Sequence, residues 1–110
     1  MNSKELEPRV DKALQFLRDD AMQHAQARAN ADYMDAWVKL ELARIKGLIV
    51  GNDSDAAKTA EAMRHPAYLE ALQAKKEADR EWYTVQFKRD AANALIEAWR
   101  TCCSNERANV

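Results

Sequence analysis

The chain has 110 residues, of which 47% are hydrophobic and 32% charged, with 17 basic residues against 18 acidic ones. Chains of this length usually form one domain, so we expect residues 1–110 to make a single helical domain. The composition excludes a disordered chain, and the net charge of −1 excludes a globally basic nucleic-acid binder. Twenty-one alanines beside two glycines and two prolines are typical of an all-α protein.

No segment predicts contact with a membrane. Apolar runs such as residues 48–50 are far shorter than the roughly 18 residues of a transmembrane helix. The first eight residues lack the apolar core of a signal peptide, so we expect a cytoplasmic protein, in the bacterial host cytoplasm if a phage encodes it. Cys102 and Cys103 are adjacent and do not form the framework of a small secreted domain, which favours reduced thiols.

The first predicted helix spans about residues 8–50. Apolar residues recur at helical spacing from Val10 to Ile49, and no proline follows Pro8 before the helix ends. Ser3 is a candidate N-cap, and a helix tolerates proline in its first turn. The small and polar stretch 23–31 marks the place where we expect a bend or a change of packing partner.

Two further helices follow a clear break. Gly51 suits a left-handed C-terminal cap, and Asp53 or Ser54 suits the next N-cap, which predicts a short helix over 55–64. Pro66 ends that helix, because the residue before a proline is displaced from helical angles, and it can open the next one. We expect a long helix over 66–102 and a frayed tail over 103–110.

The last helix carries a heptad pattern. Successive residues of this pattern are separated by three or four positions in turn, about 3.5 on average, which is typical of a left-handed coiled coil. The predicted seam consists of Tyr68, Leu72, Lys75, Ala78, Trp82, Val85, Arg89, Ala92, Ile96, Trp99 and Cys103.

These elements predict an elongated, coiled-coil-like antiparallel hairpin of two long helices with a short connecting helix. If Val50 faces Pro66, the numbers of paired residues add to about 116, which places Met34 opposite Trp82. A lone hairpin leaves much of its apolar surface exposed. We therefore expect a homodimer that forms a four-helix bundle.

The chemistry of the sequence does not predict an enzyme. His24, His65, Cys102 and Cys103 are the soft metal ligands, and the predicted hairpin holds them too far apart for one zinc ion. No glycine pattern matches a phosphate loop, and no serine or cysteine has a base beside it. We expect no catalytic residue, cofactor or metal site within one copy; a zinc ion shared by the adjacent cysteines of two copies stays open.

A nucleic-acid contact is an alternative function. In the predicted hairpin, basic residues form a band near the loop end, and phosphate contacts from such a band would be salt-sensitive. The competing interpretation, which we favour, is a solvated face with helical ion pairs. The band consists of Lys39, Arg44, Lys46, Lys75, Lys76 and Arg80.

Four aromatic residues are candidates for a protein interface, because aromatic side chains dominate interface hot spots. They are Trp37, Trp82, Tyr83 and Trp99. Burial in the bundle core is the alternative, and we favour it for Trp82 and Trp99, while for Trp37 the two interpretations are balanced.

Residues 94–101 (ALIEAWRT), 104–108 (SNERA) and 64–68 (RHPAY) resemble short helical phage and prophage proteins. Such proteins are often encoded near single-strand annealing recombinases, and most have no assigned activity. Cys102 and Cys103 stand where these proteins usually have alanine. The resemblance covers the C-terminal half; it implies a phage origin and an accessory role in DNA metabolism, and it assigns no functional residue.

Together these observations predict a non-enzymatic phage or prophage accessory protein. We expect it to act through protein–protein interaction, in DNA recombination or replication. Weak direct nucleic-acid binding and inhibition of a host defence enzyme are the alternatives.

Overall fold

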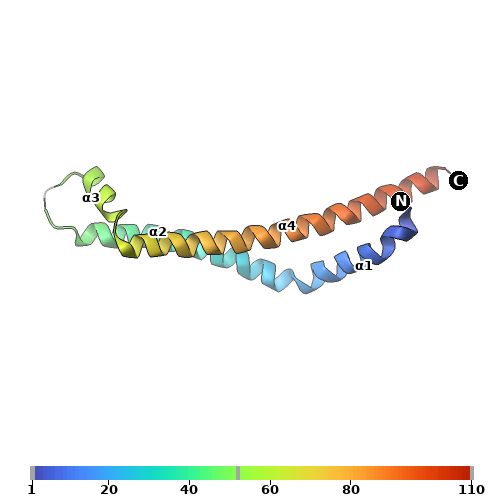
Figure 1. Ribbon diagram of the computed structural model, residues 1–110, viewed down its shortest axis with the longest axis horizontal. Coiled ribbons are helices and arrows are strands. Elements are labelled where there is room, and N and C mark those ends of the chain that lie inside the picture. Colours follow the sequence, from blue (N-terminus) through green and yellow to red (C-terminus); the bar gives the residue numbers. More distant parts are fainter. Residues whose placement is uncertain (1, 52, 110) are drawn as a thin grey trace. The chain divides into compact units, whose positions relative to one another are not determined.

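The computed structural model describes residues 2–51 and 53–109, and these residues form four helices and no strand (Figure 1). The helices are α1 (Ser3–Asp19), α2 (Ala21–Leu48), α3 (Asp55–Ala62) and α4 (Pro66–Ala108). The predicted all-α class is thereby confirmed. None of the described helices combines the length and the apolar character that crossing a bilayer requires.

The helix predicted over 8–50 starts earlier and is divided in two. Asn2 is the N-cap in place of Ser3, because its side-chain oxygen accepts the backbone N–H of Glu5 at 2.9 Å. The division falls at Asp20, three residues before the polar stretch in which we expected a bend. Helical hydrogen bonds continue across it, since Asp20 donates to the Phe16 carbonyl and accepts from the backbone of His24.

The connecting segment and the last helix follow the predicted signals with different ends. Gly51 has a φ of 129°, a backbone conformation that favours glycine, but it lies three residues after the end of α2 and is not its cap. Ser54 caps α3, accepting from the backbone N–H of Ala57 at 3.2 Å. The short helix ends two residues before its predicted end. Pro66 opens α4, which stays helical through most of the predicted tail, to Ala108.

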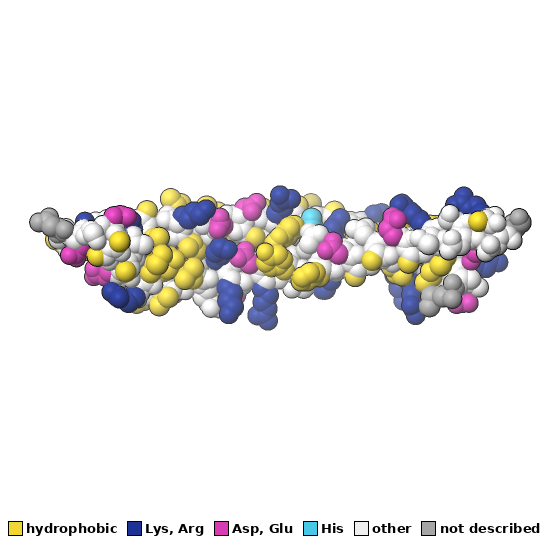
Figure 2. Space-filling view, turned by 90° about the horizontal axis from the view of Figure 1, so that it is seen from above, with side chains coloured by type: hydrophobic (Ala, Val, Ile, Leu, Met, Phe, Trp, Pro, Cys, Tyr) yellow, Lys and Arg dark blue, Asp and Glu magenta, His cyan; other side chains and the backbone are white. Residues whose placement is uncertain are grey.

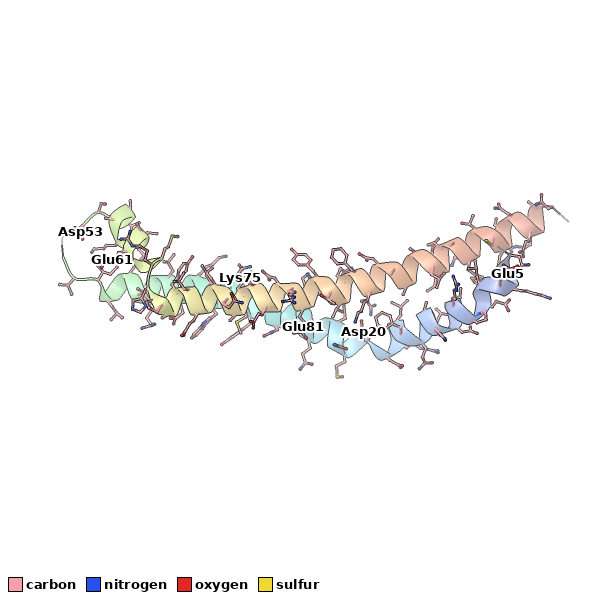
Figure 3. All side chains as sticks on the ribbon, in the orientation of Figure 1. Glu5, Asp20, Asp53, Glu61, Lys75 and Glu81 are labelled. Atoms are coloured by element: carbon pink, nitrogen blue, oxygen red, sulfur yellow. The ribbon has the colours of Figure 1, made fainter. Side chains whose placement is uncertain are left out.

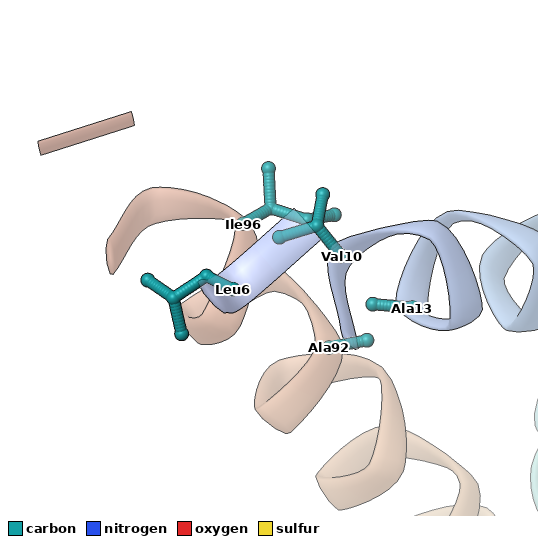
Figure 4. Packing of buried hydrophobic residues seen from close by; sticks show 5 residues of the cluster. All are labelled: Leu6, Val10, Ala13, Ala92 and Ile96. Carbon is teal, nitrogen blue, oxygen red and sulfur yellow. The ribbon is translucent and has the colours of Figure 1, made fainter. Parts of the chain in front are cut away.

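The chain divides into two compact units, each with its own core. Unit 1 comprises Met1–Ala25 and Tyr83–Val110, and unit 2 comprises Gln26–Trp82. In unit 1, α1 packs on the last part of α4 (Figure 4), through Leu6, Val10, Ala13, Ala92 and Ile96. In unit 2, side chains of α2, α3 and α4 pack together, namely Val38, Ile45, Ala62, Tyr68 and Ala71.

The heptad seam predicted for α4 is confirmed except at one position. Leu72 is exposed and Ala71 is buried in its place, while the other predicted positions are buried or half-buried. Helices α1 and α2 carry a matching series whose steps also alternate between three and four residues. It consists of Ser3, Leu6, Val10, Ala13, Leu17, Asp20, His24, Ala27, Ala31, Met34, Val38, Glu41 and Ile45, all buried or half-buried.

Polar contacts fix how these two series pair in unit 1. Ser3 donates to Glu106 from its backbone N–H at 2.8 Å and from its hydroxyl at 2.6 Å. Asp20, at the junction of α1 and α2 (Figure 3), lies 3.5 Å from Arg89. The numbers of the paired residues add to 109 in both cases, so the segments run antiparallel.

In unit 2 the paired numbers add to 110, since Asp35 lies 4.0 Å from Lys75 and Arg28 lies over the ring of Trp82. The predicted register is therefore wrong by about one heptad, and Met34 lies beside the Asp35 that faces Lys75 instead of opposite Trp82. The cause is the connector. Helix α3 packs Ala62 against the end of α2, so α2 extends past the start of α4.

Candidate interaction surfaces

Two of the four predicted interface aromatics contribute to packing within their own unit. Trp82 is half-buried, and the guanidinium carbon of Arg28 lies 5.9 Å from its ring centroid, a cation–π arrangement. Trp99 is half-buried against the core of unit 1. Its indole N–H is buried and has no hydrogen-bond partner among the described residues.

The other two aromatics are exposed on different units. Trp37 is 40% exposed in unit 2, and its ring stacks on that of Tyr33 with centroids 6.5 Å apart. Tyr83 is 56% exposed in unit 1. Each of them has other exposed apolar residues nearby on the same helix.

In unit 2, α2 carries a second apolar series on the side away from its buried one. The steps again alternate between four and three residues, and every member is exposed: Ala29, Tyr33, Ala36, Leu40, Ala43 and Gly47. We call this series the α2 outer face. We did not predict this face, although its spacing of four and three residues is present in the sequence.

In unit 1, α4 has a comparable exposed surface. Phe87 is 68% exposed one turn after Tyr83, and three exposed alanines continue the same side of the helix, namely Ala91, Ala94 and Ala98. We call these five residues the α4 outer face. Of these five residues, we predicted only Tyr83 as an interface candidate. Figure 2 shows hydrophobic side chains at the surface between charged ones.

The six basic residues of the predicted band all belong to unit 2, and acidic side chains lie among them. Four of the six face carboxylates within 4 Å: Lys39 faces Asp35, Arg44 faces Glu41, Lys46 faces Asp55, and Lys75 faces both Asp79 and Asp35. The register places Arg44 opposite Pro66, which lies nine residues before Lys75 on α4. Arg44 and Lys75 are therefore not neighbours. Lys76 and Arg80 are exposed beside Lys75. The surface therefore alternates in sign, which favours the solvated-face interpretation.

Three of the acidic groups have a lowered pKa. Hydrogen bonds from the Arg44 guanidinium lower the pKa of Glu41, and the Lys46 ammonium does the same for the pKa of Asp55. Hydrogen bonds from Ser3 lower the pKa of Glu106. All three groups are therefore held in the ionised form.

The histidine and cysteine side chains do not gather. Nε2 of His24 lies 3.1 Å from Oε1 of Gln86, and Cys102 and Cys103 are half-buried free thiols. In the part of the chain that the structure describes, no three His, Cys, Asp or Glu residues are placed to hold one metal ion.

Comparison with protein-family models, with curated proteins and with solved structures finds no match for this chain. The two outer faces are the features of the described chain that bear on its function.

Proposed function

We propose that the protein is not an enzyme and acts by binding other proteins, as a homodimeric bundle of antiparallel hairpins. The supporting observation is the distribution of its apolar side chains. Seven of the 14 buried hydrophobic residues are alanines, whereas 12 large hydrophobic residues of the described chain are exposed. Contiguous exposed apolar patches mark interaction sites on soluble proteins. Large exposed side chains beside an alanine-rich core therefore indicate interaction surfaces.

The α4 outer face is the surface we assign to the protein partner. Tyr83 and Phe87 lie one turn apart and are both more than half exposed, as hot-spot aromatics are before binding. The alanines that follow let a partner helix approach closely. The resemblance to phage proteins supports a partner that acts in DNA recombination or replication.

Site-specific photocrosslinking in bacterial cells tests this assignment. Benzoylphenylalanine replaces Phe87 or Tyr83, and in the matched control it replaces Asn93, which is exposed on another side of the same helix. We expect the same adduct from positions 83 and 87 and none from position 93. The adduct is identified by mass spectrometry, and the purified partner should bind the Phe87→Ala variant at least about tenfold more weakly, a cost of about 1.4 kcal/mol.

Adducts at position 87 that contain only this chain, or adducts equally frequent at position 93, would contradict a heterologous partner on this face. Far-ultraviolet circular dichroism of each variant checks that the helices are intact. Because both aromatics are exposed in the chain, we expect no loss of helicity.

A further inference from the structure

We infer that the α2 outer face joins two copies of the chain, with the two α2 helices antiparallel about a two-fold axis. This inference rests on the dimer proposed above and names its interface. The face lies within unit 2, is exposed along its whole length and contains no charged residue.

The order of large and small residues on this face is self-complementary. An antiparallel pair places Tyr33 opposite the partner's Ala43, and Leu40 opposite the partner's Ala36. Each bulky side chain then meets an alanine, and the ends of the face pair Ala29 with the partner's Gly47. Inside the chain, the core of unit 1 contains a comparable pair, Ala13 and Ile96.

Gly47 provides a separate observation. It is the second-to-last residue of α2, near a helix end where glycine is common, and a Cβ built on it would meet nothing within 4 Å. The missing side chain lets a second helix approach closely at this end of the face.

The residues that flank the face favour the antiparallel direction. On one side, Asp32 lies beside the partner's Lys46, an attraction that occurs twice, while Lys39 meets the partner's Lys39 at the axis, a single repulsion. On the other side, Trp37 lies beside the partner's Trp37. A parallel pair would instead bring Lys39 beside the partner's Arg44 and repel.

The mass in solution, from light scattering after size exclusion, tests the inference. We expect the full chain at micromolar concentration to have about twice 12.5 kDa. Ala36→Glu and Ala43→Glu should each give the monomer mass with unchanged helicity, because they place charges only at the interface. Ala60→Glu, an exposed alanine of α3, is the matched control and should remain dimeric.

Disulfide formation tests the direction in a Cys102→Ser/Cys103→Ser background. Trp37→Cys should form a covalent dimer on oxidation, whereas Tyr33→Cys should not. A monomeric wild type, a dimer that survives Ala36→Glu, or crosslinking through Tyr33→Cys alone would overturn the inference. A monomeric wild type would also contradict the proposed dimer, whereas a dimer that survives Ala36→Glu would contradict only this interface. Crosslinking at position 87 tests the other protein partner separately.

Discussion

Glu41 is a carboxylate in the buried series of α2, where a heptad pattern calls for an apolar side chain. It is 8% exposed, and Arg44 donates two hydrogen bonds to it, at 3.0 and 2.9 Å. This bidentate contact lowers the pKa of Glu41 and keeps it ionised although it is buried. The arginine is exposed enough to stay hydrated, so the pair does not bury two charges.

The lowered pKa values of Glu41, Asp55 and Glu106 predict a loss of stability in acid. Each group binds its proton more weakly in the folded chain than in the unfolded one. Its contribution is present above the ordinary carboxyl pKa of about 4 and is lost as the pH falls through the lower folded value. We expect the Tm from thermal circular dichroism to fall between about pH 5 and pH 2.

Glu41→Gln provides the control for this prediction. It removes one proton-linked group, so its Tm at neutral pH should be lower and its dependence on acid shallower than in the wild type. A Tm that stays constant or rises below the ordinary carboxyl pKa would contradict the contribution of these contacts.

At the scale of elements, α3 is a short helix that depends on one small buried side chain. Ala62 is 0% exposed and packs in the cluster that contains Ile45 and Tyr68. An eight-residue helix has little stability of its own, so its position comes from this contact and from the Ser54 cap.

Ala62→Leu should therefore destabilise the protein by about 1–3 kcal/mol, because the larger side chain has no space beside α2. Ala60→Leu is the matched control on the exposed side of α3 and should stay within about 0.5 kcal/mol of the wild type. Urea unfolding followed by circular dichroism measures both. Equal stabilities of the two variants would show that α3 does not pack as described.

At the scale of the whole molecule, the spacing of residues predicted which positions of α4 are buried but not what they face. A shift of one heptad keeps every buried position buried and changes only its partner. The predicted register would place Asp20 opposite Ile96 and Arg89 opposite Ala27, two buried charges without partners. The observed register places them 3.5 Å apart, with neither facing atom making a hydrogen bond.

The exposed surfaces were harder to predict for a related reason. Two series at helical spacing follow α2, and spacing alone does not say which of them faces a neighbouring helix. Only the pairing of the helices shows which side of each helix is left outside. We expected burial of Trp82 and Trp99 in the core, because both belong to the α4 heptad series, and the structure shows both half-buried.

Cysteine crosslinking distinguishes the two registers within one chain. The observed register places Leu6 opposite the Cys102–Cys103 pair, whereas the predicted register places Ala13 there. We expect Leu6→Cys to form a disulfide with a native cysteine on oxidation, identified by mass spectrometry of the linked peptides, and Ala13→Cys to form none. Since unpaired buried charges oppose the shift, replacing the pair by Asp20→Leu/Arg89→Leu should let the Ala13→Cys link appear. A link from Ala13→Cys with Asp20 and Arg89 intact would contradict the observed register.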